Sequence, residues 1–166
     1  MFFCDRRWLN AILAIGQPVP DFTLTDQNQQ QVALCLISDK IVATFVCVRC
    51  PLPNYRFRFS TNFARLQKRF RSALASDLVL LTVIIAPVHD SPQAFNDYAR
   101  IWNADPQAWH FQTGSPAEIQ QVRARFDMNY YPDEALLVHS FHTVVIDRQG
   151  NPATNIDAYP MVITTT

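Results

Sequence analysis

Residues 41–56 decide how the rest of this chain is organised, and they read Ile-Val-Ala-Thr-Phe-Val-Cys-Val-Arg-Cys-Pro-Leu-Pro-Asn-Tyr-Arg. The first half, Ile41 to Val48, is rich in β-branched residues and nearly free of polar ones, which predicts a strand buried on both faces, as in a parallel sheet. The apolar run stops at Cys50 and Pro51, and a helix is expected to follow. Because functional groups of open α/β sheets gather beyond the carboxyl ends of the strands, Cys50 stands where chemistry is expected.

The Cys50 thiol also precedes the predicted helix, so it faces the positive end of that helix dipole. This field favours the thiolate, which is the form that attacks disulfides and binds metals. If Cys50 is redox-active, Cys47 is a candidate partner, because the pair has the CxxC spacing of thioredoxin-type redox sites and of several copper-binding loops. An extended backbone at Cys47 would hold the two thiols too far apart for a disulfide, so a buried, structural Cys47 is preferred.

Composition restricts the class of protein. The chain has 166 residues, 49% of them hydrophobic, and no apolar run long enough to span a bilayer, which predicts one domain with a sizeable core. The formal net charge is +0, so the balance of charge gives no reason to expect a nucleic-acid partner. Between Lys40 and Asp77 the chain has seven basic and no acidic residues, which we interpret as a solvated basic helix face.

The other cysteines and the N-terminus give weaker signals. Four cysteines, at positions 4, 35, 47 and 50, are too few and too irregularly spaced for a disulfide scaffold, and we interpret Cys4 and Cys35 as bystanders. They do not decide the redox compartment. Residues 1–15 form an N-terminal extension that makes a poor signal peptide, although it could be a remnant of one.

The remaining segments alternate between strand and helix patterns. In chain order they predict a β-hairpin around Asn28, a helix from about Phe59 to Ala75, a strand from Leu78 to Ile85, a helix from Pro92, a short strand at 109–111, a helix from Pro116 and strand-like residues 135–147. Residues 151–166 show no helical period and are expected to be an irregular C-terminal tail. This order fits an α/β fold with a mixed central sheet and helices on both faces.

Five segments together carry a family likeness: residues 49–55 (Arg-Cys-Pro-Leu-Pro-Asn-Tyr), 62–67, 89–92, 98–102 and 139–150, the last beginning His-Ser-Phe-His. They resemble the Sco/SenC family of thioredoxin-like copper chaperones. The resemblance runs from about Gly16 to Gly150 and implies a thioredoxin-like domain over residues 16–150 with an N-terminal β-hairpin. The C-terminal helix of that family is not recognisable in this chain.

The resemblance also implies a site and a role. That family delivers copper, as Cu(I) or Cu(II), during cytochrome c oxidase assembly, and its ligands are two cysteines of one loop and a distant histidine. Cys50 matches the first cysteine and His139 the histidine, while Arg56 stands at the position of the second cysteine. The family further implies an oxidase subunit as the copper-receiving partner and a periplasmic or membrane-associated location.

Three departures from the family pattern stand close to this site. Arg56 cannot ligate copper, and its permanent charge opposes a bound cation while it stabilises the Cys50 thiolate. Phe57 replaces the proline that usually follows the second cysteine, and Ala86 replaces an aspartate. We therefore expect weakened or lost copper binding and no disulfide between the two cysteine positions of the family.

Two alternatives remain open from sequence. One is a thiol-disulfide redox protein of the thioredoxin or peroxiredoxin class with Cys50 as nucleophile, although a peroxiredoxin would carry threonine and proline where this chain has Cys47 and Ala43. The other is a thioredoxin-fold binding module without a working site. The sequence does not decide whether the protein is an enzyme, nor its oligomeric state.

Overall fold

The computed structural model describes residues 18–37, 40–46, 53–84, 86–87, 91–126, 128, 130–132 and 137–161, and for 40, 53–56, 92, 130–132, 137–142 and 155–161 it describes the backbone only. The strands are β1 (Thr23–Asp26), β2 (Gln31–Ala33), β3 (Lys40–Val46), β4 (Leu78–Ile84), β5 (Trp109–Thr113), β6 (Tyr130–Pro132), β7 (Leu137–Ile146) and β8 (Pro152–Met161). The helices are α1 (Pro53–Arg69), α2 (Pro92–Ile101) and α3 (Pro116–Arg125), with a short 3-10 helix, η1 (Leu34–Leu36).

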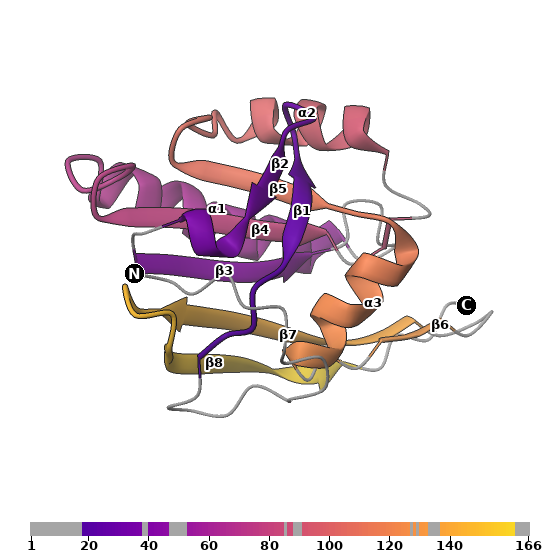
Figure 1. Cartoon of the computed structure of the whole chain (residues 1–166). Coiled ribbons are helices and arrows are strands. Elements are labelled where there is room, and N and C mark those ends of the chain that lie inside the picture. The colour runs from indigo at the N-terminus through magenta and orange to yellow at the C-terminus, as the bar shows by residue number, and fades with distance from the viewer. Residues whose placement is uncertain are drawn as a thin grey trace.

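The strands form one mixed sheet in the order β2-β1-β5-β4-β3-β7-β6, and β8 pairs with β7 (Figure 1). The three central strands, β3, β4 and β5, are parallel, whereas β7 runs antiparallel to β3. The expected N-terminal β-hairpin is β1 and β2. Its turn has no glycine, but Gln29 adopts a φ of 64° and the Asp26 carboxylate accepts hydrogen bonds from the backbone N–H groups of Asn28 and Gln30.

Helices cover both faces of the sheet, as predicted, and each face has its own core. On one face, Ile119 and Val122 of α3 pack in a cluster that includes Phe45 of β3. On the other face, Phe63 of α1 and Phe95 of α2 pack in a second cluster around Trp109 and other residues of the strands. Successive residues of β4 alternate between these two clusters, which explains why a central strand reads as a continuous apolar run.

Helix starts follow the capping signals. The Ser91 hydroxyl accepts from the Ala94 N–H at the start of α2, and Ser115 and Glu118 form a capping box at the start of α3, the helix predicted from Pro116. The boundaries of the first helix were predicted wrongly. α1 begins at Pro53 rather than near Phe59, because proline fits the first turn of a helix, and it ends at Arg69.

The C-terminal segment is also a correction. We expected an irregular tail after residue 151, but residues 152–161 form β8 along β7. The two prolines of this segment argue against a strand, because a proline lacks the N–H that a ladder hydrogen bond needs. The register of the β7–β8 pair shifts between Val145 and Ile146, next to Pro152, and again between His139 and Phe141, next to Pro160. Irregularities of this kind accommodate proline in a strand.

Candidate functional site

The segment that contains Cys50 leaves the carboxyl edge of the sheet. β3 ends at Val46 and α1 begins at Pro53, while Cys47 and Cys50 lie outside the described residues. The first turn of α1 contains no acidic residue, so no carboxylate within that turn offsets the positive end of the dipole. The described neighbours of Cys50 therefore provide a strand end and a helix start, the two elements from which thiolate activation was predicted.

The position of His139 follows from the pairing of β7. The last pair between β7 and β3 is Thr143 with Thr44, and from there β7 continues four residues to His139 in the direction in which β3 runs to its carboxyl end. The observed partners of His139 are Tyr130 in β6 and Met161 in β8. Toward the carboxyl edge, β7 therefore no longer pairs with β3 and pairs with β6 instead. The His139 backbone lies at this edge, and the direction of its side chain is outside the description.

Arg56 is part of a helix. Its backbone lies in α1, one turn after Pro53, and its side chain is not described. The next residue, Phe57, is 41% exposed, and its ring centroid lies 6.2 Å from that of Trp102 at the end of α2. A proline here would lack the N–H that a helix uses after its first turn. The replacement of proline by Phe57 is therefore compatible with an α1 that begins at Pro53.

The described part of the loop after β4 supplies no carboxylate to the predicted site. Ala86 is 3% exposed and belongs to the α3-face core, so this position supplies a packed methyl group and no carboxylate. His89 and Asp90, in the family-like segment 89–92, lie outside the described residues. Within the described part of the chain, no group of three or more His, Cys, Asp or Glu residues could hold a metal ion.

His110 is a further histidine whose titration is perturbed. Burial lowers the pKa of His110, and the nearby charges of Asp26 and Asp105 oppose that change. Its Nδ1 atom is buried without a hydrogen-bond partner. On β5 it pairs with Leu81, in the middle of β4 rather than at its carboxyl end. His110 therefore lies within the sheet, away from the edge where Cys50 is expected.

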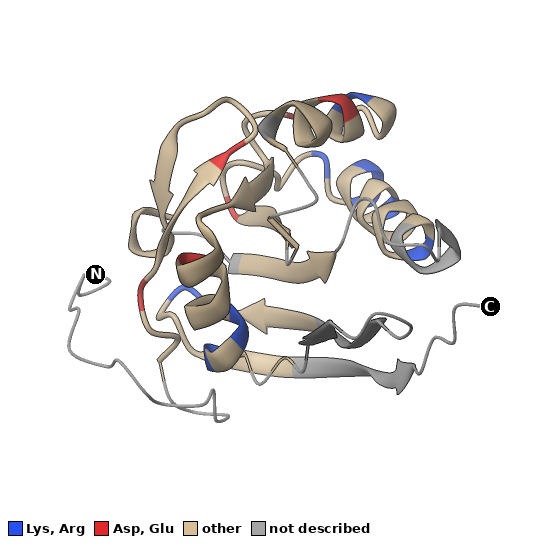
Figure 2. Cartoon of the chain, turned by 90° about the vertical axis from the view of Figure 1, so that its right-hand side faces the viewer, with Lys and Arg blue, Asp and Glu red and all other residues tan. Residues whose placement is uncertain are grey.

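The basic face predicted for the first helix is exposed. Blue segments follow one another along α1 in Figure 2, and the exposed cations described there are Arg58, Arg65, Lys68 and Arg69. Lys68 and Arg69 occupy the last turn, where a positive charge is favourable to the helix dipole. This supports the interpretation as a solvated helix face.

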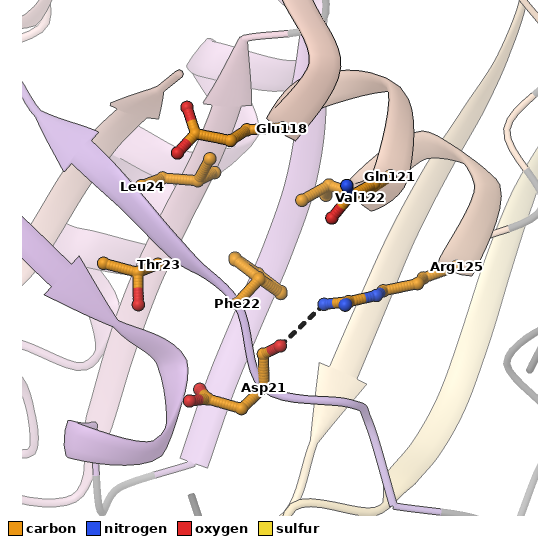
Figure 3. Close-up of a pocket in the computed structure, with 8 residues that line it drawn as sticks. All are labelled: Asp21, Phe22, Thr23, Leu24, Glu118, Gln121, Val122 and Arg125. Atoms are coloured by element: carbon orange, nitrogen blue, oxygen red, sulfur yellow. Dashed lines mark hydrogen bonds between the residues drawn. The ribbon is translucent and has the colours of Figure 1, made fainter. Parts of the chain in front are cut away.

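A groove of about 330 Å³ lies between β1 and α3, on the face away from α1 and α2 (Figure 3). Two charged side chains of its lining are engaged within the chain. Arg125 donates to the Asp21 carbonyl oxygen at 2.6 Å, and the Glu118 carboxylate accepts from both the N–H and the hydroxyl of Ser115. The described residues that line the groove belong to β1, the two residues before it and α3.

One cysteine differs from our expectation. Cys35, which we interpreted as a bystander, is disulfide-bonded. It lies in η1 and is half-buried. Irregular cysteine spacing gave no signal for this bond.

Comparisons with known proteins place this architecture among thioredoxin-like folds. The chain is 21% identical to copper-bound ScoI of Arabidopsis thaliana, with a TM-score of 0.68 over 87% of this chain and 88% of that one. It is 18% identical to copper-bound yeast Sco1, with a TM-score of 0.67 over 86% and 79%. The thioredoxin domain of a thiol-disulfide oxidoreductase from Bacteroides vulgatus is 12% identical, with a TM-score of 0.64 over 88% and 91%.

A search of curated proteins gave no match. None of the helices in the described part of the chain is sufficiently long and apolar to cross a membrane. The family model described as SCO1/SenC matches residues 16–161, which includes β8 as well as the segments quoted from the sequence. This match extends over most of the chain and agrees with the fold, and the chain belongs to the SCO1/SenC family.

Proposed function

We propose that this protein binds Cu(I) through the Cys50 thiolate and the His139 imidazole, at a site weakened by Arg56, and passes copper to a subunit of cytochrome c oxidase. The observation that carries the proposal is the register of β7. Because β7 runs antiparallel to β3, its His139 end lies toward the carboxyl end of β3, the strand that precedes Cys50. Two donors far apart in the sequence would thereby meet at one edge.

The chemistry of the donors suits this metal. A thiolate is a soft ligand that selects Cu(I), and an imidazole can complete a site of low coordination number. Arg56 offers no lone pair and carries a permanent positive charge. Arg56 belongs to the first turn of α1, the helix that follows Cys50 in the chain. We therefore expect measurable binding that is weaker than a site with two cysteines and one histidine would give.

Family membership supports the role in copper delivery. The Arabidopsis and yeast relatives were solved with copper bound, and the resemblance of the sequence motifs to the family implies oxidase assembly. The thioredoxin-like fold is equally compatible with thiol-disulfide exchange. The redox alternative, with Cys50 and Cys47, is therefore retained as an outcome of the experiment.

An anaerobic Cu(I) competition titration of the reduced protein tests the proposal. It is run near or above neutral pH, because the ligands must be a thiolate and a neutral imidazole. We expect one-to-one binding that is lost in both Cys50→Ala and His139→Ala. His142→Ala, three residues along the same strand, is the matched control and should retain binding. Binding that is absent, or indifferent to both site variants, would reject the copper site and favour the redox or binding-module alternatives.

Restoring a thiol at position 56 is a sharper test of the weakened site. Arg56→Cys should add a third ligand and remove the opposing charge, and should raise Cu(I) affinity by more than the roughly 10- to 100-fold typical of outer-shell residues. Arg58→Cys is the control, because Arg58 is an exposed cation on the same helix. If both variants change affinity equally, the assignment of position 56 to the second ligand is wrong.

A further inference from the structure

The partner of Cys35 follows from the two edges of the sheet. Cys35 is disulfide-bonded, and the other cysteines, at positions 4, 47 and 50, lie outside the described residues. We infer that Cys35 pairs with Cys4, and that the bond fastens the N-terminal extension to the amino edge of the sheet. Cys47 and Cys50 then remain as thiols at the opposite edge.

The first step locates Cys35 beside the lead-in to β1. The Cys35 N–H donates to Asp21 Oδ1 at 2.8 Å, and the Leu34 N–H donates to the Phe22 carbonyl oxygen at 2.9 Å. Asp21 is itself held by α3, since its carbonyl oxygen accepts from Arg125 (Figure 3). Figure 3 shows the Asp21 carbonyl directed at Arg125 and its carboxylate directed away, which leaves that carboxylate for η1.

The second step locates this lead-in at the amino edge. The Val19 N–H donates to the Gly150 carbonyl oxygen at 2.7 Å. Gly150 belongs to the turn that follows β7, and the last residue of β7, Ile146, pairs with Ile41 at the start of β3. The turn therefore lies beyond the amino end of β3. Asp21 is two residues from Val19, so Cys35 is held on the same side.

The third step excludes the two cysteines of the candidate site. β3 runs from Lys40 to Val46, and seven residues of strand span about 20 Å. Cys47 follows directly after this strand and Cys50 is three residues further, both past its carboxyl end. Disulfide formation requires Cα atoms roughly 4.4 to 6.8 Å apart. By contrast, the N-terminal extension enters the described structure at Pro18, next to the edge that holds Cys35.

Formation of the bond is an exchange reaction. The thiolate of one of the two cysteines attacks the disulfide of an oxidising protein or of oxidised glutathione, and the second thiolate displaces the mixed disulfide. Cys4 and Cys35 lose two protons and two electrons, and the oxidant becomes two thiols. Since such bonds persist in oxidising compartments, the pairing indicates that the protein folds in one, which the cysteine count alone left open.

Peptide mapping of the non-reduced full chain tests this assignment directly. Cleavage after Lys and Arg separates all four cysteines into different peptides, residues 1–6, 8–40, 41–49 and 50–56. Free thiols are alkylated under denaturing conditions without reductant before digestion. We expect a linked pair of peptides 1–6 and 8–40 that disappears on reduction, together with alkylated peptides 41–49 and 50–56.

Two variants keep the experiment decisive. Cys4→Ser should release an alkylated peptide 8–40, whereas Cys50→Ser should leave the link intact. A link between peptide 8–40 and either 41–49 or 50–56, or an alkylated peptide 8–40 in protein folded under oxidising conditions, would overturn the inference. The copper titration uses different cysteines, so each proposal can fail without the other.

Discussion

The described residues at the two ends of β3 differ in what they provide. At its amino end, three hydrogen bonds join segments that are distant in sequence: Val19 to Gly150, Cys35 to Asp21, and Arg125 to Asp21. At its carboxyl end, β3 stops at Val46, and β7 pairs with β6 instead of β3. Among the described residues, the amino edge thus joins distant segments by hydrogen bonds, and the carboxyl edge presents a strand end and a helix start.

This difference separates two uses of cysteine in one chain. A structural disulfide needs rigid anchors at a fixed distance, which the amino edge supplies around Cys35. A ligand or nucleophile needs a thiolate near a helix start, which the carboxyl edge supplies to the segment containing Cys50. Exposed charges add little to this contrast: Arg148 and Asp77 pair near the amino edge, but both are largely exposed, and such pairs contribute weakly to stability.

The largest expected effect comes from removing the disulfide at the amino edge. If Cys4 and Cys35 are joined, Cys35→Ser should lower the free energy of unfolding by about 2 to 4 kcal/mol, because the unfolded chain is no longer constrained by a closed loop. Cys4→Ser should cost a similar amount, and the double variant no more than either single one. Urea unfolding without reductant measures these values. Additive losses in the double variant would show that the two cysteines do not act as one bond.

Removing the Arg125 side-chain anchor should have a smaller effect at the same edge. Burial lowers the pKa of Arg125, although the charge of Asp21 opposes this, so its guanidinium depends on the 2.6 Å bond to the Asp21 carbonyl. We expect Arg125→Met to cost about 1 to 2 kcal/mol, since bonds to charged groups are worth more than neutral ones but this side chain is only partly buried. Arg65→Met, an exposed cation on α1, is the control. Equal losses in both would mean that the anchor is no stronger than a surface charge.

The sequence predicted the central features of the fold better than its C-terminal end. The long apolar runs predicted β3 and β4, and the Ser115 and Glu118 capping box predicted the start of α3, because each signal is local. β8 was missed because Pro152 and Pro160 argue against a strand, and only the register shifts along β7 explain how it forms.

The candidate site was predicted only in part, for a related reason. Motif resemblance named Cys50 and His139 as the predicted site, whereas the position of the His139 backbone follows only from the pairing of β7 with β3 and β6, strands far apart in sequence. The disulfide of Cys35 gave no local signal at all. Its position depends on Val19, Asp21 and the turn at Gly150, which meet only once the sheet has formed.

The smallest expected effect concerns the α3 start, at the carboxyl edge. Hydrogen bonds from Ser115 to the Glu118 carboxylate lower the pKa of Glu118 from 4.5. A carboxyl group with a lowered pKa binds fewer protons in the folded state, so its contribution is present above about pH 4.5 and is lost as pH falls through the folded pKa. Glu118→Gln should remove this part of the acid sensitivity. Because Glu118 is exposed, we expect no more than about 0.5 kcal/mol.

Unfolding measured near neutral pH and again below the ordinary pKa of glutamate should detect this change as a flatter dependence on pH in Glu118→Gln. Asp97→Asn is the matched control, since Asp97 lies on the surface of α2 and accepts only from the Gln93 side chain among its described hydrogen bonds. If both variants flatten the curve equally, the acid sensitivity comes from general surface charge rather than from the capping box. A flatter pH dependence in Glu118→Gln alone would instead show that one local cap stabilises the start of α3, in contrast to the long-range contacts at the amino edge.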